Sequence, residues 1–170
     1  MTIRIAFVRN AARAILKNIP DLKPPISMTD IASRLKLEIG EYSDMPSDRS
    51  ALILQDKKMI VINPKHADVR KRFSIAHEIG HYVLGHFEDR NIEELENEDN
   101  DEVFRKTAYD KWSSDQESEA NEFAAELLMP YALLKNLVTN KKPAELAEIF
   151  NVSEESMWIR LTKQKLIKYL

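Results

Sequence analysis

Cysteine is absent from this 170-residue sequence, and only three glycines and four histidines occur in it. Without cysteine the chain can form no disulfide and offers no thiolate, so any bound metal ion must take nitrogen and oxygen ligands. The sequence also lacks an apolar run of about 18 residues, the length that crosses a bilayer. Its start carries Arg4, Arg9 and Arg13 and has no unbroken apolar stretch of the kind found in signal peptides. We therefore expect a cytoplasmic protein with no membrane contact.

Positive charge is not in excess, because the formal net charge is -3 and the sequence pI is near 5.9. Such a balance gives no overall field that would hold a polyanion, so direct nucleic-acid binding is not expected. Hydrophobic residues make up 44% of the sequence, which suffices for the core of one domain. Nothing in the composition indicates an oligomeric state.

The spacing of apolar residues predicts short helices and strands in alternation. The expected elements are an N-terminal helix ending at Pro20, a helix at 30–36, strands at 37–42, 51–54 and 59–62, a helix at 68–84 with Gly85 as its stop, a helix from Asp115 to Pro130, and three short helices in 131–170. We expect an α+β fold in which a small, mostly antiparallel sheet of about three strands is packed by the 68–84 helix and flanked by N- and C-terminal helices. Residues 1–130 would form the main domain and residues 131–170 a C-terminal helical lobe, which can belong to the same domain.

Residues 88–102 carry nine carboxylates in fifteen positions. A segment of this charge with few apolar anchors is expected to be a solvated connector. The functional alternative is a rim that selects basic segments of a substrate.

The string His77-Glu-Ile-Gly-His81 is an HExxH motif. On a helix, positions i and i+4 share one face, so both imidazoles can approach one ion while Glu78 lies beside it. Zinc lowers the pKa of its bound water toward about 7, and an adjacent carboxylate can accept the proton as the hydroxide attacks a carbonyl. The surrounding residues are apolar, and imidazoles on a mostly buried helix need partners, which a metal ion supplies. The motif predicts a zinc peptidase in which His77 and His81 bind Zn²⁺ and Glu78 is the general base.

A third ligand is expected on the helix that begins near Asp115, because catalytic zinc keeps three protein ligands and leaves one position for water. Glu117 and Asn121 share one face of that helix, and Glu119 lies on another. Alanines beside Asn121 permit close approach to the motif helix. These phases favour Glu117 as the metal ligand, with Asn121 hydrogen bonding a ligand histidine. Glu119 remains the alternative ligand.

These residues resemble the ImmA/IrrE family of bacterial and phage metallo-endopeptidases. The similarity is carried by the HExxH motif and by the string Glu117-Ser-Glu-Ala-Asn-Glu-Phe-Ala-Ala-Glu-Leu-Leu-Met-Pro130, and it extends to Arg72-Phe-Ser-Ile-Ala76. Members are similar to gluzincins such as thermolysin, whose third ligand is a Glu with an acid or amide partner four residues on. The resemblance thus also implies Glu117 and Asn121. It further implies cleavage of a helix-turn-helix transcriptional repressor, which releases genes of a mobile element or a stress response.

Residues 144–153 and 157–161 look like a helix-turn-helix, with Ser153 capping the second helix. A DNA-binding regulator is therefore an alternative function, and a catalytically silent binding partner is another. Glu154 and Glu155 open the second helix, where they would repel DNA phosphates, so packing or repressor docking is favoured. The presence of Glu78 favours the peptidase over the silent partner, because a structural metal site needs no general base.

Three further features remain open. Candidates to stabilise the oxyanion are Tyr82, Tyr109 and Tyr131. His86 would lie about 140° around a continuing helix from His81, which favours packing over catalysis. The strand at 59–62 is a candidate edge onto which an extended peptide could add.

Overall fold

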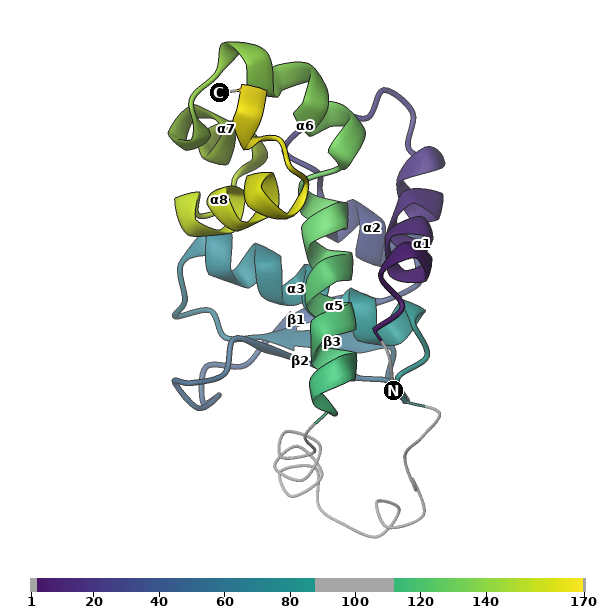
Figure 1. The fold of residues 1–170 in the computed structure, drawn as a ribbon. Coiled ribbons are helices and arrows are strands. Elements are labelled where there is room, and N and C mark those ends of the chain that lie inside the picture. Colours follow the sequence, from purple (N-terminus) through teal and green to yellow (C-terminus); the bar gives the residue numbers. More distant parts are fainter. Residues whose placement is uncertain (1–2, 88–111, 170) are drawn as a thin grey trace, which may run out of the picture.

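The computed structural model of the chain describes residues 3–87 and 112–169 and shows helices stacked on a small sheet (Figure 1). The helices are α1 (Ile5–Lys17), α2 (Met28–Arg34), α3 (Asp68–Val83), α5 (Ser114–Leu128), α6 (Tyr131–Leu137), α7 (Pro143–Phe150) and α8 (Glu154–Lys163). The strands are β1 (Glu38–Glu41), β2 (Ala51–Leu54) and β3 (Met59–Ile62). The α+β fold class is confirmed. The acidic segment 88–102 lies outside the described residues.

The strand order of the sheet is β1-β3-β2, and the sheet is mixed. β2 runs antiparallel to β3, as the hairpin predicted, whereas β1 runs parallel to β3. The strand at 59–62 is therefore the central one, and the prediction that it forms an edge is wrong. Its last three residues, Ile60, Val61 and Ile62, are all buried, as an unbroken apolar run in a central strand would be. β2 is the edge strand of the described sheet on the side of the hairpin.

α3 packs on β2 and β3, and α5 in turn crosses α3 at close range (Figure 1). The crossing is close because Gly80 of α3 faces Ala120 of α5. A Cβ atom at Gly80 would lie 3.2 Å from the Ala120 Cα and 3.2 Å from a ring carbon of Phe123. Small residues at this point bring the two helix backbones together, and with them the side chains on either side of the contact.

Ion pairs join the N-terminal segment to α5. They are Arg4–Glu119 at 2.8 Å, Arg9–Glu122 at 2.7 Å and Arg13–Glu126 at 2.8 Å. All three carboxylates are buried, so they need charged partners to offset the loss of hydration. The face of α5 that carries these three carboxylates therefore contacts the N-terminal segment and α1. The face that carries Glu117 contacts α3.

The helices α6, α7 and α8 gather at one end of α5, away from the sheet (Figure 1). Their buried apolar residues belong to the same core cluster as those of α1 and α3. Arg160 of α8 is 1% exposed and reaches into this core, where it donates to the Met129 carbonyl and pairs with Glu122 and Glu126. The boundary at residue 130 stays a prediction. None of the described helices is both long and apolar enough to cross a membrane.

Candidate metal centre

The imidazoles of His77 and His81 and the carboxylate of Glu117 meet between α3 and α5. The two histidine Nε2 atoms lie 2.9 Å apart. Glu117 Oε2 lies 3.3 Å from Nε2 of His77, and Oε1 lies 3.6 Å from Nε2 of His81. Within residues 3–87 and 112–169, these three side chains form the one cluster of ligand atoms found that could hold a metal ion. The donor set of two nitrogens and a carboxylate suits a divalent transition metal.

Asn121 lies one turn after Glu117, and its Oδ1 is 3.0 Å from Nδ1 of His77. When Nε2 of His77 binds a metal ion, the proton of that ring is on Nδ1, which donates to Asn121. Such a bond fixes the orientation of a ligand ring and raises its basicity. The structure thus brings Asn121 to the position that the helical phase predicted.

Glu78 lines a pocket of about 520 Å³ together with His77, Glu117 and residues of β2. One wall is Trp112, whose ring stacks on His81 at a centroid distance of 4.2 Å. Arg49 also lines the pocket. The pocket therefore offers a carboxylate beside the cluster and an apolar wall behind it, next to the edge of the sheet.

Burial and mutual contacts shift the pKa values of the ionisable groups at the pocket. Burial raises the pKa of Glu78 to about 7, although the charges of His77 and Arg49 oppose it. Burial lowers the pKa of His81 to about 4, so this ring is neutral near pH 7. Burial also lowers the pKa of His77, but the hydrogen bond to Glu117 and the charge of Glu78 more than offset it, and the pKa is raised. Hydrogen bonds from the two histidines hold the pKa of Glu117 well below its usual range. A bound cation would displace the proton from His77, since metal ions bind the neutral imidazole.

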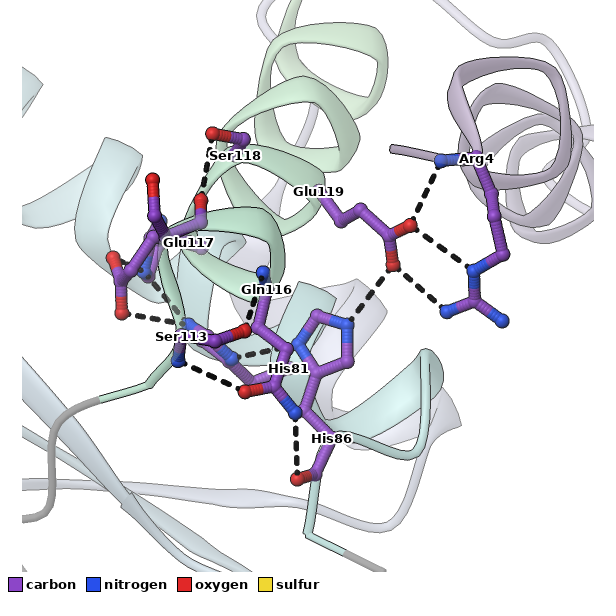
Figure 2. Close-up of polar contacts among 10 residues, drawn as sticks. Arg4, His81, His86, Ser113, Gln116, Glu117, Ser118 and Glu119 are labelled. Carbon is purple, nitrogen blue, oxygen red and sulfur yellow. Dashed lines mark hydrogen bonds and ion pairs between the residues drawn. The ribbon is translucent and has the colours of Figure 1, made fainter. Parts of the chain in front are cut away.

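Glu119, the alternative ligand, faces away from the cluster. Its carboxylate accepts from the backbone N–H, Nε and Nη2 of Arg4 at 2.9, 3.0 and 2.8 Å. Its Oε2 also lies 3.3 Å from Nε2 of His86 (Figure 2). Hydrogen bonding to Arg4 lowers the pKa of Glu119 to about 2, with burial opposing. The structure therefore places Glu119 behind the cluster, and Glu117 within it.

His86 is the residue that the sequence-based interpretation underestimated. It is 3% exposed, and its Nδ1 lies 2.8 Å from Nδ1 of His81. The chain turns back toward His81 because α3 ends at Val83 and Gly85 adopts the left-handed conformation, with φ 70°. The His86 N–H then donates to the His81 carbonyl and the Gly85 N–H to that of Tyr82, a Schellman motif. The helix ends before His86, as Gly85 predicted, so the position about 140° around a continuing helix does not apply.

The two described oxyanion candidates, Tyr82 and Tyr131, do not line the pocket. Tyr109 lies outside the described residues. Arg49 is the one arginine or lysine among the lining residues that the structure describes.

Three comparisons place the chain among known proteins. A model of the IrrE N-terminal-like domain, Peptidase_M78, matches residues 31–162. The search of curated proteins found no match. Among solved structures, a Mycobacterium tuberculosis transcriptional regulator aligns with a TM-score of 0.66 at 14% identity, covering 92% of this chain and 46% of that one. This chain thus spans about half the length of that regulator. At such identity the likeness concerns the fold alone.

Proposed function

The chain belongs to the Peptidase_M78 family of IrrE N-terminal-like domains, and on that premise we propose that it is a zinc-dependent endopeptidase that cleaves a helix-turn-helix transcriptional repressor. The observation that carries the proposal is the convergence of His77, His81 and Glu117, with Glu78 in the same pocket. Membership of a metallopeptidase family supports peptide-bond hydrolysis as the reaction. The site contains three candidate metal ligands and a candidate general base.

The spacing of the ligand atoms supports zinc. Ligands about 2.0–2.2 Å from a tetrahedral ion are about 3.3–3.6 Å from one another. The two distances from Glu117 oxygens to the histidine Nε2 atoms, 3.3 and 3.6 Å, lie in this range, and the Nε2–Nε2 distance of 2.9 Å is shorter, so the imidazoles would move apart slightly around an ion. Three protein ligands leave a fourth position for water, which is the arrangement of a catalytic site rather than a structural one. A bound zinc ion would supply a water of lowered pKa and polarise the substrate carbonyl.

Glu78 would move the proton. Its carboxylate has a pKa raised to about 7 by burial, which matches a group that must accept a proton from the attacking water and return it to the leaving amine. Arg49 lines the same pocket, and its positive charge would stabilise the negative charge that develops on the carbonyl oxygen of the substrate.

An extended substrate would lie along β2. Ala51, Leu52 and Ile53 of this edge strand line the pocket beside His77 and Glu78. A peptide that adds to a sheet edge has its backbone held by main-chain hydrogen bonds, and its side chains alternate between the two faces. The scissile bond would then lie over the metal centre.

A repressor as substrate is supported by the resemblance of the site sequence to repressor-cleaving enzymes. The DNA-binding alternative is disfavoured by α8, whose first turn carries Glu154 and Glu155. At the position where a recognition helix meets DNA, two carboxylates would repel the phosphates.

The test compares wild-type protein with Glu78→Gln. We expect about one zinc per chain in both, and cleavage of a co-expressed repressor encoded near the gene by wild type only, because an amide cannot accept the proton. Metal is measured by atomic emission and cleavage by the appearance of a shortened repressor band. Equal cleavage by both proteins would remove Glu78 from the mechanism. Intact repressor with zinc-loaded wild type, also under DNA damage, would count against the peptidase and favour the silent partner.

A further inference from the structure

A buried chain of contacts runs from the metal centre to the start of α1 (Figure 2). His81 Nδ1 meets His86 Nδ1 at 2.8 Å, and His86 Nε2 meets Glu119 Oε2 at 3.3 Å. Glu119 is held in turn by Arg4. His81 and His86 are 0% and 3% exposed, and Glu119 is 4% exposed, so water does not compete for the two contacts that His86 makes. The Arg4 side chain, at the far end of the chain, is 46% exposed. The chain lies behind the ligand, on the side away from the pocket.

The positions of the protons follow from the contacts. When Nε2 of His81 binds a metal ion, the one proton of the neutral ring is on Nδ1. That N–H must donate to Nδ1 of His86, which is then the unprotonated nitrogen. The remaining His86 N–H, on Nε2, donates to the carboxylate of Glu119. One neutral tautomer of each ring thus satisfies every donor and acceptor along the chain.

The charges alternate along the same path. A cation at the cluster, the two neutral rings, the Glu119 carboxylate and the Arg4 guanidinium follow one another. A carboxylate behind a ligand histidine commonly raises the basicity of that ligand. Here the carboxylate acts through an intervening imidazole, and it is itself fixed by three hydrogen bonds from Arg4.

We propose that His86 is a positioning residue of the metal centre: supported by Glu119 and Arg4, it holds His81 in the orientation and tautomer that bind the metal. His86 does for His81 what Asn121 does for His77. Arg4 lies outside the matched residues 31–162, so this chain adds to the domain a support from its own N-terminal segment. The inference rests on the proposed function, because it presupposes that His81 binds a metal ion.

The test uses the full chain and does not require a substrate. His86→Phe keeps a planar aromatic ring but removes the acceptor of the His81 proton, and His86→Asn keeps an acceptor oxygen near the position of Nδ1. His66→Phe is the matched control, because both ring nitrogens of His66 are also hydrogen bonded: Nε2–H donates to the Ser47 carbonyl, and Nδ1 accepts from the Ser50 hydroxyl. Zinc affinity is measured by competition with a chelator. Cobalt absorption spectra report the ligand geometry, and thermal unfolding of the metal-free proteins reports the fold.

We expect His86→Phe to weaken zinc binding about 10- to 100-fold and to change the cobalt spectrum. His86→Asn should recover most of the affinity, and His66→Phe should bind zinc as wild type does. Glu119→Gln, which keeps the side-chain shape, should weaken zinc binding less than His86→Phe.

Wild-type zinc affinity and an unchanged cobalt spectrum in His86→Phe would overturn the inference while leaving the proposed function intact. The inference would also fail if His86→Phe lowered only the unfolding temperature, since that is a structural role. Absence of zinc from wild-type protein would instead overturn the proposed function, and this inference with it.

Discussion

Two glutamates of α5, two positions apart, have opposite surroundings. Glu117 is 42% exposed at its side chain and contacts two imidazoles, whereas the side chain of Glu119 is 6% exposed and is held by Arg4. Both carboxylates have lowered pKa values, but for different reasons: hydrogen bonds with the histidines for Glu117, and with Arg4 for Glu119. The same residue type is therefore expected to serve metal binding at one position and stability at the other.

The pair Glu117→Gln and Glu119→Gln separates these roles. We expect Glu117→Gln to weaken zinc binding far more than Glu119→Gln, because an amide oxygen is a poor replacement for a charged ligand. Glu119→Gln should mainly destabilise the metal-free protein, by about 1 kcal/mol, because it removes the charge that Arg4 binds; the loss is limited because the Arg4 side chain is 46% exposed. Chelator competition and denaturant unfolding of the metal-free variants measure the two effects. The reverse order of zinc affinities would make Glu119 the ligand.

Removal of a ligand imidazole is the simpler test. We expect His81→Ala to lose most bound zinc, because two remaining ligands hold the ion far less tightly than three. Metal analysis after gel filtration measures the content. Stoichiometric zinc in this variant would rule out His81 as a ligand.

Among the elements, the crossing of α3 and α5 sets the geometry of the centre, because it brings the HExxH face to Glu117. We expect Gly80→Ala to destabilise the protein by about 1–2 kcal/mol, since the new Cβ would lie 3.2 Å from the Ala120 backbone, which cannot rotate away. Zinc affinity should fall as well, because the helices must separate.

Gly40→Ala is the control for this substitution. The Cβ added there would lie 3.5 Å from Met59 Sδ, an ordinary contact with a flexible side chain. We expect unchanged zinc affinity and a change in the free energy of unfolding below about 0.5 kcal/mol, measured by urea denaturation. Equal effects of the two substitutions would show that the helix crossing tolerates a wider separation.

The sequence predicted the bounds of the helices and strands more reliably than which elements lie beside one another. The strands at 51–54 and 59–62 were predicted at their observed bounds, because alternating turn signals and apolar runs are local. The parallel pairing of β1 with β3 was missed, because periodicity reports which face of a strand is buried and not which strand lies beside it.

The same distinction holds at the centre. His77, His81, Glu117 and Asn121 could be brought together from helical phase, since all four positions follow from two regular helices. The contact of His86 with His81 depends on the turn at Gly85, and that of Glu119 with Arg4 on the docking of a helix more than a hundred residues away. Arg4, Arg9 and Arg13 are evident in the sequence as charges, but nothing local in the sequence identifies their partners.

For the molecule as a whole, Arg160 links the C-terminal helices to α5. We expect Arg160→Leu to lower the free energy of unfolding by about 3 kcal/mol, because it leaves Glu122 and Glu126 buried with fewer positive charges. Lys163→Met is the control: the Lys163 side chain is 59% exposed, its Nζ lies 3.7 Å from Glu122, and its loss should cost less than about 1 kcal/mol.

Denaturant unfolding followed by circular dichroism measures both variants. Similar stabilities would contradict a structural role for the buried guanidinium. Loss of helix signal in a separate early transition would show that the C-terminal helices unfold before the rest, which would support a lobe that begins after residue 130.

The ion pairs between the N-terminal segment and α5 have a consequence for synthesis on the ribosome. Arg9 and Glu122 are separated by 113 positions in the chain. At about 5–20 residues per second, each arginine is synthesised roughly 6–23 seconds before its carboxylate partner. During that interval α1 has none of its α5 partners, and Glu117 does not yet exist to complete the ligand set. The nascent chain therefore carries the HExxH helix without a complete metal centre, and the proposed activity begins only after translation has passed α5.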